Sequence, residues 1–163
     1  MKKPKCEILY KKNKYYHIYN RGHHKSPIYR CKKDYLSFIR LMERYLDGYD
    51  IVLISYCLMP NHYHLVLKLG ESKMDISKFM QRFMTAYSCY FNRKYGLVGT
   101  VFQNRFEARR LDDYIDLFNM IKYLKNNPLE AGITSIKKRY RWLYIKKKIL
   151  KVGPRPGLEE KKV

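Results

Sequence analysis

The stretch Pro60-Asn61-His62-Tyr63-His64-Leu65-Val66-Leu67-Lys68-Leu69 lies in the middle of the chain and has its clearest pattern. The Pro-Asn pair is typical of a turn, and the residues after it alternate in character. Because a β-strand has a side-chain period of two, the tyrosine and the three leucines lie on one face, and the histidines, the valine and the lysine lie on the other. Both imidazoles therefore project from the face opposite the leucines. Two imidazoles side by side can form half of a metal site, although histidines on strand surfaces also occur without a metal.

The segments on either side of this strand have patterns of their own. Aromatic and β-branched residues predict a first strand at 15–20, and a nearly continuous apolar run predicts another at 51–58, which forms a hairpin with the strand at 62–69. Apolar residues at helical spacing predict helices at 33–46 and from 76 to about 96. A fourth strand is expected at 103–111, followed by a third helix that Asp112 or Asp113 caps and that Pro128 ends after Asn127.

The predicted order is therefore β-α-β-β-α-β followed by a helix. This order is that of a ferredoxin-like α+β fold, in which an antiparallel sheet carries two helices on one face. Those two helices would cover the leucine face of the histidine strand, and the third helix would be free to lie across or beside the other face. We divide the chain into a basic N-terminal arm at 1–14, one domain at 15–135, and a basic tail at 136–163 that we expect to be partly disordered.

Composition indicates the kind of partner. The chain of 163 residues has 35 Lys and Arg against 14 Asp and Glu, a formal net charge of +21, which favours a polyanion. Nucleic acid is the first candidate and an acidic membrane surface the second; aromatic residues make up 15% of the chain, which suits stacking on single-stranded bases. No long apolar run or cleavable leader is evident, and the four cysteines form no Cys-x-x-Cys pair. We therefore expect a cytoplasmic protein with reduced thiols and no membrane segment.

The third predicted helix carries a second polar pair. An apolar stripe follows helical spacing, and a more polar group lies on its flank. The stripe consists of Tyr114, Leu117, Phe118, Ile121 and Leu124, and the flank of Asp116, Met120, Tyr123 and Asn127. Tyr123 and Asn127 are spaced i and i+4, so their side chains lie one above the other. A phenol and an amide directed to one point become interesting if that point is beside the histidines. The alternatives are a tyrosine at the edge of the core and an asparagine that only caps the helix.

Four blocks of the sequence resemble a known family. Residues 16–22 (YHIYNRG), 59–65 (MPNHYHL), 102–106 (FQNRF) and 123–128 (YLKNNP) are similar, in order and spacing, to single-tyrosine transposases of the HUH class. The likeness is to the branch of REP-associated tyrosine transposases, and it extends from about residue 15 to residue 135. Tyrosine in the middle position of His62-Tyr63-His64 is bulkier than the aliphatic residue usual in that family.

The resemblance implies a single-stranded DNA endonuclease and strand transferase that acts on hairpin-containing DNA in the nucleoid of a prokaryotic-type cell. It assigns Tyr123 as the nucleophile that becomes joined to a 5′ phosphate, and His62, His64 and Asn127 as metal ligands. Two imidazoles with an amide oxygen and no nearby cysteine favour Mg²⁺ or Mn²⁺ over zinc. The protein could be a monomer or a homodimer, since some relatives exchange the tyrosine helix between subunits.

Affinity for DNA is expected to come largely from phosphate contacts. Two other functions remain open: a non-catalytic binder of single-stranded nucleic acid on the same sheet, and a metal-dependent nuclease that uses water while Tyr123 only packs. The candidate phosphate-binding residues are Arg21, Lys25, Arg30, Arg105, Arg109, Arg110, Lys122 and Lys125.

Overall fold

The computed structural model describes residues 10–71, 76–135 and 140–147. The remaining parts of the basic arm and of the basic tail lie outside the described residues. In chain order the elements are β1 (Tyr15–Arg21), the short 3₁₀ helix η1 (His23–Lys25), α1 (Lys32–Leu46), β2 (Ile51–Met59), β3 (His62–Leu69), α2 (Ile76–Tyr95), β4 (Glu107–Leu111), α3 (Tyr114–Glu130) and β5 (Leu143–Ile145).

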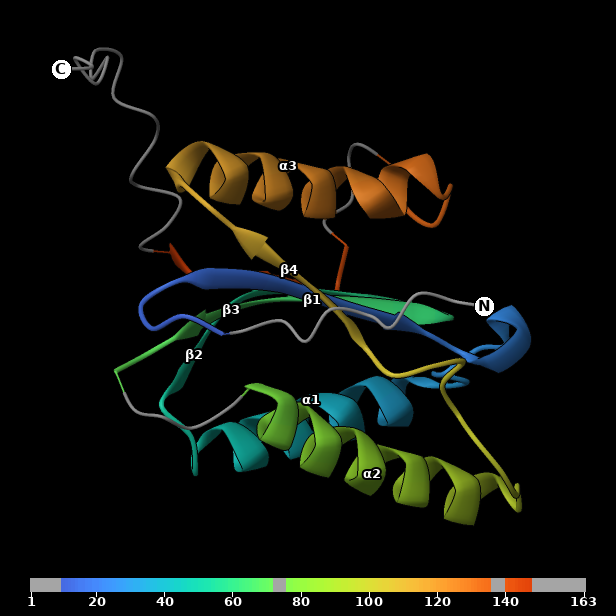
Figure 1. The fold of residues 1–163 in the computed structure, drawn as a ribbon. Coiled ribbons are helices and arrows are strands. Elements are labelled where there is room, and N and C mark those ends of the chain that lie inside the picture. Colours follow the sequence, from blue (N-terminus) through green and yellow to red (C-terminus); the bar gives the residue numbers. More distant parts are fainter. Residues whose placement is uncertain (1–9, 72–75, 136–139, 148–163) are drawn as a thin grey trace, which may run out of the picture.

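The strands form a single sheet in the order β4-β1-β3-β2-β5, and every neighbouring pair is antiparallel. Helices α1 and α2 cover one face of this sheet and α3 covers the other (Figure 1). The predicted α+β fold is confirmed, with β3, the histidine strand, at the centre of the sheet. No helix in the described ranges is long and apolar enough to cross a membrane.

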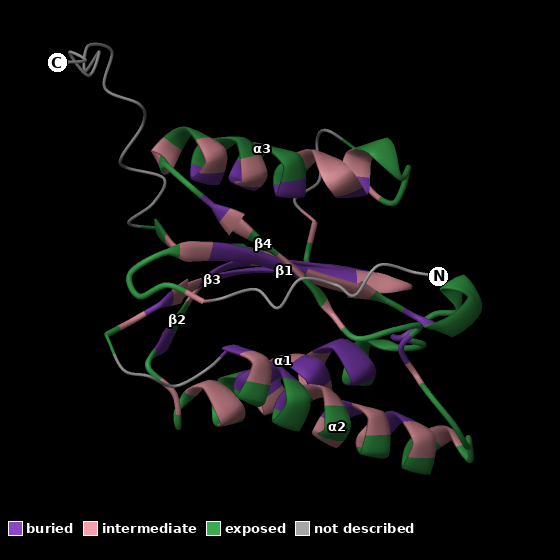
Figure 2. Cartoon of the chain, viewed as in Figure 1, coloured by how far each residue is buried: buried purple, intermediate pink, exposed green. Residues whose placement is uncertain are grey.

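Each face of β3 belongs to a different hydrophobic core. The leucine face packs with α1 and α2, where Leu65 and Leu67 share a buried cluster with Phe38 and Phe83. The opposite face contributes Val66 to a smaller cluster with α3. Figure 2 shows buried residues along the sides of the helices that face the sheet. Two-sided burial holds β3 firmly, which matters because it carries both histidines.

The N-termini of two helices are capped by carboxylates. Asp113 is the N-cap of α3 and accepts a hydrogen bond from the backbone N–H of Asp116. Of the two predicted caps, Asp112 and Asp113, it is therefore the second that forms. In α1, the fully buried Asp34 accepts from the backbone N–H groups of Arg30 and Cys31. Each cap satisfies helix-end donors that would otherwise lack a partner.

Two predicted boundaries were wrong. Helix α3 continues past Asn127 and ends at Glu130, with Pro128 buried inside it. A proline in the last turn loses a single helical hydrogen bond, so it does not stop a helix that is held by packing. The helix ends instead near Gly132, which has a φ of 67°, a conformation that favours glycine. Strand β4 begins at Glu107 and not at residue 103. The segment before it meets β1 through an isolated bridge between Phe102 and Gly22.

A fifth strand, β5, was not predicted. It lies in the segment that we treated as a tail and pairs with β2 at the edge of the sheet. The Tyr140 hydroxyl donates to the Leu58 carbonyl at 2.6 Å, and Trp142 stacks on Tyr35 with ring centroids 4.3 Å apart. The described part of the tail, residues 140–147, is therefore attached to the sheet and to α1.

Candidate active site

The two histidines of β3 lie together on the side of the sheet that α3 covers. Their ring centroids are 5.1 Å apart and their planes are nearly perpendicular. Antiparallel pairing places Arg21 opposite His62 and Tyr19 opposite His64, so β1 contributes side chains to the same face. The prediction that both imidazoles project from the face opposite the leucines is confirmed.

Neighbouring polar groups contact both imidazoles. The Nδ1 atom of His62 lies 2.7 Å from Oδ1 of Asn61, and because an amide oxygen only accepts, this Nδ1 carries the hydrogen. Nε2 of His62 then keeps a free lone pair. His64 has contacts at both nitrogens: its Nδ1 is 2.9 Å from Nε2 of His17, and its Nε2 is 3.2 Å from Nδ2 of Asn127.

Helix α3 brings Tyr123 and Asn127 to the histidines of the same chain. The Tyr123 ring meets the His64 ring edge-on with centroids 5.7 Å apart, and 44% of Tyr123 is exposed. Buried Leu117, Ile121 and Leu124 anchor the opposite side of the helix on the sheet. The i and i+4 pair identified from spacing therefore does lie beside the paired imidazoles, with its phenol accessible from outside.

Burial keeps the histidines neutral. The pKa of His64 falls to about 3, chiefly through desolvation and then through His17 and His62. Desolvation, followed by the charge of Arg109, lowers the pKa of His17 to about 4. The pKa of His62 is also lowered, first by desolvation and then by the nearby charge of Arg21. All three rings are thus uncharged near pH 7, which is the form that binds metals.

Some of the predicted phosphate-binding residues lie on the histidine face or on α3, and others do not. Strand pairing places Arg21 and Arg109 on the face that carries the histidines; Arg21 donates to Gln103 at 3.1 Å, and Arg109 lies 3.6 Å from Asp116. Exposed Lys122 and Lys125 lie on α3 next to Tyr123 in sequence.

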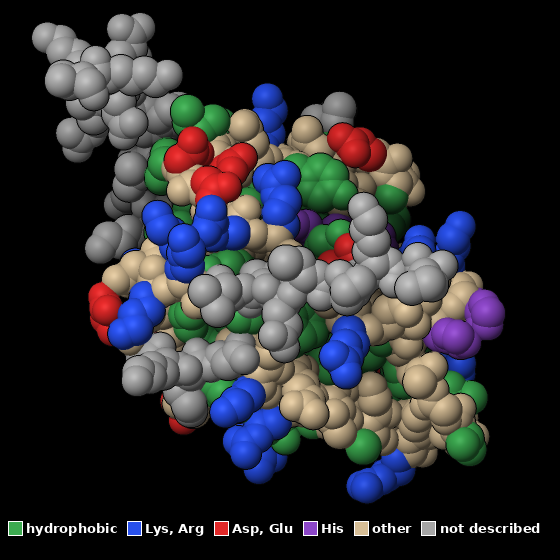
Figure 3. Space-filling view, in the orientation of Figure 1, with side chains coloured by type: hydrophobic (Ala, Val, Ile, Leu, Met, Phe, Trp, Pro, Cys, Tyr) green, Lys and Arg blue, Asp and Glu red, His purple; other side chains and the backbone are tan. Residues whose placement is uncertain are grey.

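The other predicted phosphate-binding residues lie outside the histidine face of the sheet. Arg30 stacks 4.5 Å from the Tyr95 ring at the end of α2, and Arg110 pairs with Asp112. Lys25, in η1, and Arg105, in the segment before β4, are exposed, and the Lys25 carbonyl accepts from Nδ2 of Asn61. Figure 3 shows Lys and Arg side chains distributed over the whole visible face rather than gathered in one patch.

Sequence reasoning missed three residues of this site. His17 and Tyr19 stack with ring centroids 5.0 Å apart, and the Tyr19 hydroxyl donates to the Glu107 carboxylate. Hydrogen bonding to Glu107 and burial raise the pKa of Tyr19. The third residue is Asn61, the partner of His62. A signal for His17 and Tyr19 existed, because they alternate with the buried Tyr16 and Ile18 and so had to share a face of β1.

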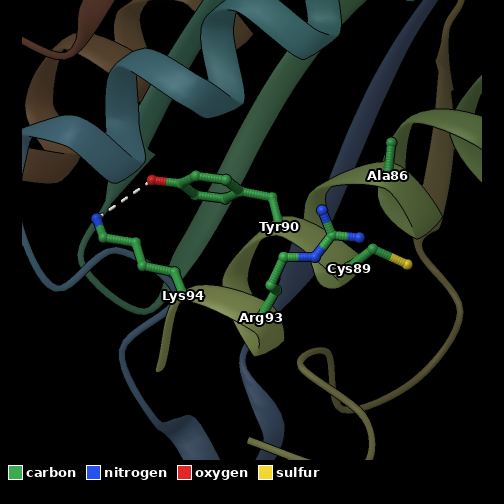
Figure 4. A pocket seen from close by; sticks show the side chains of 5 residues that line it. All are labelled: Ala86, Cys89, Tyr90, Arg93 and Lys94. Carbon is green, nitrogen blue, oxygen red and sulfur yellow. Dashed lines mark hydrogen bonds between the residues drawn. The ribbon is translucent and has the colours of Figure 1, made fainter. Parts of the chain in front are cut away.

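A pocket of about 450 Å³ lies elsewhere, along the C-terminal half of α2. Figure 4 shows the hydrogen bond between Lys94 and Tyr90 at this pocket, with an Nζ to hydroxyl distance of 3.2 Å. It contains none of the residues described above, and its lining consists of Ala86, Cys89, Tyr90, Arg93 and Lys94.

Two solved structures are similar to this chain in fold. The REP-associated tyrosine transposase bound to a REP hairpin is 16% identical, with a TM-score of 0.71 over 86% of this chain and 81% of that chain. A putative transposase from Deinococcus radiodurans R1 is 14% identical, with a TM-score of 0.51 over 77% of this chain and 97% of that chain. No curated protein matches the sequence.

The family model described as IS200-like transposase matches residues 10–127. This range includes β1, the whole of β3 and most of α3, and therefore both histidines, Tyr123 and Asn127. The match covers most of the chain and associates it with DNA processing in transposition. The chain belongs to the IS200-like transposase family.

Proposed function

We propose that this protein is a metal-dependent endonuclease and strand transferase for single-stranded, hairpin-containing DNA, and that Tyr123 forms a 5′-phosphotyrosine intermediate. The observation that supports this most strongly is the meeting of two distant segments. Tyr123 lies against His64 with ring centroids 5.7 Å apart, and Asn127, one turn further along α3, contacts the Nε2 atom of the same imidazole. Family membership supports the wider class of reaction.

The residues present fit a divalent ion. Within the described ranges no three His, Cys, Asp or Glu residues are grouped so that they could hold a metal, so a third ligand has to be of another kind. Asn127 meets this requirement, because its amide also carries an oxygen. His62 and His64 are neutral, and the bond from Asn61 leaves Nε2 of His62 free. His62, His64 and Asn127 would hold the ion. From the sequence we expected no cysteine nearby, but Cys57 lies opposite His64 on β2; burial raises the pKa of its thiol to about 12, so it stays protonated. Mg²⁺ or Mn²⁺ suits a site with an oxygen ligand and no thiolate.

Such an ion, when bound, supplies charge neutralisation and orientation of the scissile phosphate. The covalent chemistry belongs to Tyr123. Its phenolic oxygen would form a bond to phosphorus as the bond from phosphorus to the 3′ oxygen breaks, and the released 3′ oxygen takes up a proton to become a hydroxyl. The phenol gives its own proton to solvent, which the 44% exposure of the side chain permits.

A phosphotyrosine keeps the energy of the broken bond. A phenolate leaves phosphorus more readily than an alkoxide does, so a later 3′ hydroxyl can displace Tyr123 and rejoin strands without ATP. Water as nucleophile would end the reaction at a free 5′ phosphate. The use of a tyrosine therefore agrees with strand transfer, the reaction that transposition requires.

Support for hairpin DNA as substrate comes from charge and from fold. The formal net charge is +21, Arg21 and Arg109 lie on the same face of the sheet as the histidines, and exposed Lys122 precedes Tyr123 on α3. The structurally similar REP-associated transposase is bound to a REP hairpin. Basic residues next to a reacting phosphodiester would position the DNA backbone without specifying bases.

The test is cleavage of an end-labelled single-stranded hairpin in the presence of Mn²⁺, compared for the wild type, Tyr123→Phe and Tyr144→Phe. Tyr144 lies on β5 and is 39% exposed, close to the 44% of Tyr123, so it controls for loss of an accessible hydroxyl. We expect Tyr123→Phe to slow cleavage by at least about a thousandfold, in line with removal of other enzymatic nucleophiles. Hairpin affinity should be unchanged, and Tyr144→Phe should cleave normally. Cleavage that persists in Tyr123→Phe would indicate a water mechanism, and tight binding without any cleavage by the wild type would indicate a binding protein.

A further inference from the structure

His17 is a buried imidazole that no predicted role includes. We infer that His17 is a positioning residue, which fixes the tautomer and the ring orientation of His64 so that Nε2 of His64 presents its lone pair toward α3. The use of that lone pair for a metal rests on the proposed function, whereas the tautomer itself does not. The contact involved is the 2.9 Å approach of His17 Nε2 to His64 Nδ1.

The sheet places the two rings together. His17 is on β1, the strand next to β3, and both residues face α3; each is only 6% exposed. Their rings are nearly parallel, with centroids 5.1 Å apart and planes inclined by 21°. Tyr19 stacks on the His17 ring, with planes inclined by 20°. The His64 ring is thus enclosed by aromatic neighbours and has little freedom to turn.

The hydrogen-bond partners determine where the hydrogens are. The NH₂ group of Asn127 can only donate, so Nε2 of His64, at 3.2 Å, must accept. A neutral imidazole carries one hydrogen, and that of His64 is therefore on Nδ1. Nδ1 donates to Nε2 of His17, whose own hydrogen is then on its Nδ1. With the Asn127 NH₂ group directed at His64, no other arrangement of two neutral rings satisfies both contacts.

The same logic gives both histidines of β3 an equivalent support. Asn61 accepts from Nδ1 of His62, as His17 accepts from Nδ1 of His64, so both rings keep Nε2 unprotonated. His17 is not itself a third ligand, since its Nε2 is already occupied by His64. Removal of a group that orients a ligating histidine in this way typically lowers metal affinity or activity by about 10- to 100-fold.

The first experiment reads the tautomer in the protein without metal. Long-range ¹H–¹⁵N correlation spectra of ¹⁵N-histidine-labelled protein, in chelator at pH 7.5, should show a protonated Nδ1 and a bare Nε2 for His64. His17→Phe keeps a ring at this position but removes the acceptor for Nδ1. The Asn127 amide can then turn so that its oxygen accepts from Nε2, and the His64 hydrogen should shift away from Nδ1. His17→Gln offers an amide oxygen in its place and should retain the wild-type tautomer. Tyr19→Phe keeps the stacked ring and loses only the bond to Glu107, so it should also match the wild type.

The second experiment measures the Mn²⁺ affinity of each variant, by titrating Mn²⁺ and following the bound ion by electron paramagnetic resonance. His17→Phe should bind Mn²⁺ about 10- to 100-fold more weakly, and His17→Gln should recover most of the affinity. Hairpin affinity without metal should stay at the wild-type level, which a general loss of structure would not allow. A His64 that carries its hydrogen on Nε2 in the wild type, or an Mn²⁺ affinity that is unchanged in His17→Phe, would overturn the inference. If the wild type binds no Mn²⁺ while the tautomers behave as stated, the metal part of the proposed function fails and the role of His17 toward His64 stands.

Discussion

At the scale of single residues, the site depends on imidazoles that stay uncharged in a strongly basic protein. His64 is 6% exposed and lies between other neutral rings, so protonation would place a charge where little water can reach it. The charge of Arg21 also disfavours protonation of His62, and the charge of Arg109 disfavours protonation of His17. Neutral rings with directed lone pairs are suited to hold a cation, and they would interact weakly with a phosphate on their own.

This leads to a first prediction about His62→Ala and His64→Ala. Each removes a proposed ligand, so cleavage in Mn²⁺ should fall at least about a hundredfold, a loss typical of a removed metal or transition-state contact. Affinity for the uncleaved hairpin, measured by fluorescence anisotropy in chelator, should remain close to that of the wild type. His23→Ala, in exposed η1, is the matched control and should behave as the wild type. Equal losses of cleavage and binding in the two β3 variants would contradict a catalytic role.

A second prediction concerns how the free energy of unfolding of the metal-free protein depends on pH. His17 and His64 have pKa values of about 4 and about 3 in the folded protein, against 6.5 as the ordinary value. Between pH 6.5 and about 4 the unfolded chain therefore binds more protons, and the free energy of unfolding should decrease as the pH falls. Each histidine contributes a slope of up to about 1.4 kcal/mol per pH unit in this range.

Urea unfolding of the wild type and His17→Phe at pH 7, 6 and 5, in chelator, measures this slope. Removal of one titrating ring should make the stability of His17→Phe less sensitive to pH by up to about 1.4 kcal/mol per unit. Parallel curves for the two proteins would show that His17 is not held neutral by burial.

At the scale of elements, α3 has two separate tasks. One side buries Leu117, Ile121 and Leu124 against the sheet, and the flank carries Tyr123 and Asn127. Packing of the first side therefore determines where the second side points. The position of the phenol should be sensitive to changes in the core beneath α3.

A third prediction compares Leu124→Ala with Ile115→Ala. Leu124 is fully buried next to Tyr123, so its truncation should cost about 2–5 kcal/mol of stability. Ile115 is on the same helix but 63% exposed, and its truncation should change stability by less than about 0.5 kcal/mol. Urea unfolding measures both. At a temperature where each variant is folded, Leu124→Ala should cleave more slowly while Ile115→Ala cleaves normally; a Leu124→Ala protein with full stability would contradict the packing described for α3.

The elements also show what the sequence could and could not predict. Alternation over eight residues identified β3 and its two faces, because a period of two is visible within one strand. Strand β5 has three residues, too few for any period, and it is held by partners far along the chain such as Ser55, which donates to the Tyr144 carbonyl. The contact from His17 to His64 depends on pairing between strands 47 residues apart, which no local pattern records. Packing also kept α3 helical past Pro128, against the local preference.

At the scale of the whole molecule, charge is the dominant property. The chain has 35 basic and 14 acidic residues, and Lys and Arg side chains are spread over the face seen in Figure 3, so a polyanion should be attracted to more than one part of the surface. Only some of these residues lie near the histidines. General attraction and the positioning of one phosphate should therefore be separable by mutation.

A fourth prediction follows for Arg21→Gln and Arg109→Gln. Each lies on the histidine face, so each should weaken hairpin binding to different sequences alike and reduce the slope of log affinity against log salt by about 0.7–0.9. Arg110→Gln is the control, because Arg110 lies opposite Tyr16 on the other face of the sheet and pairs with Asp112. Affinities measured from 50 to 300 mM NaCl give the slopes. An unchanged slope in both variants of the histidine face would place the phosphate contacts elsewhere.

If the Tyr123 phenol attacks the phosphodiester, the protein and the DNA must pass through a covalent adduct, and that adduct can be isolated. The wild type would be incubated with a single-stranded hairpin and Mn²⁺, denatured, digested with protease and analysed by mass spectrometry. We expect a nucleotide joined through its 5′ phosphate to the peptide that contains Tyr123, and no adduct in Tyr123→Phe. Cleaved DNA with free 5′ phosphates and no adduct, or an adduct on another residue such as Tyr19, would contradict attack by Tyr123.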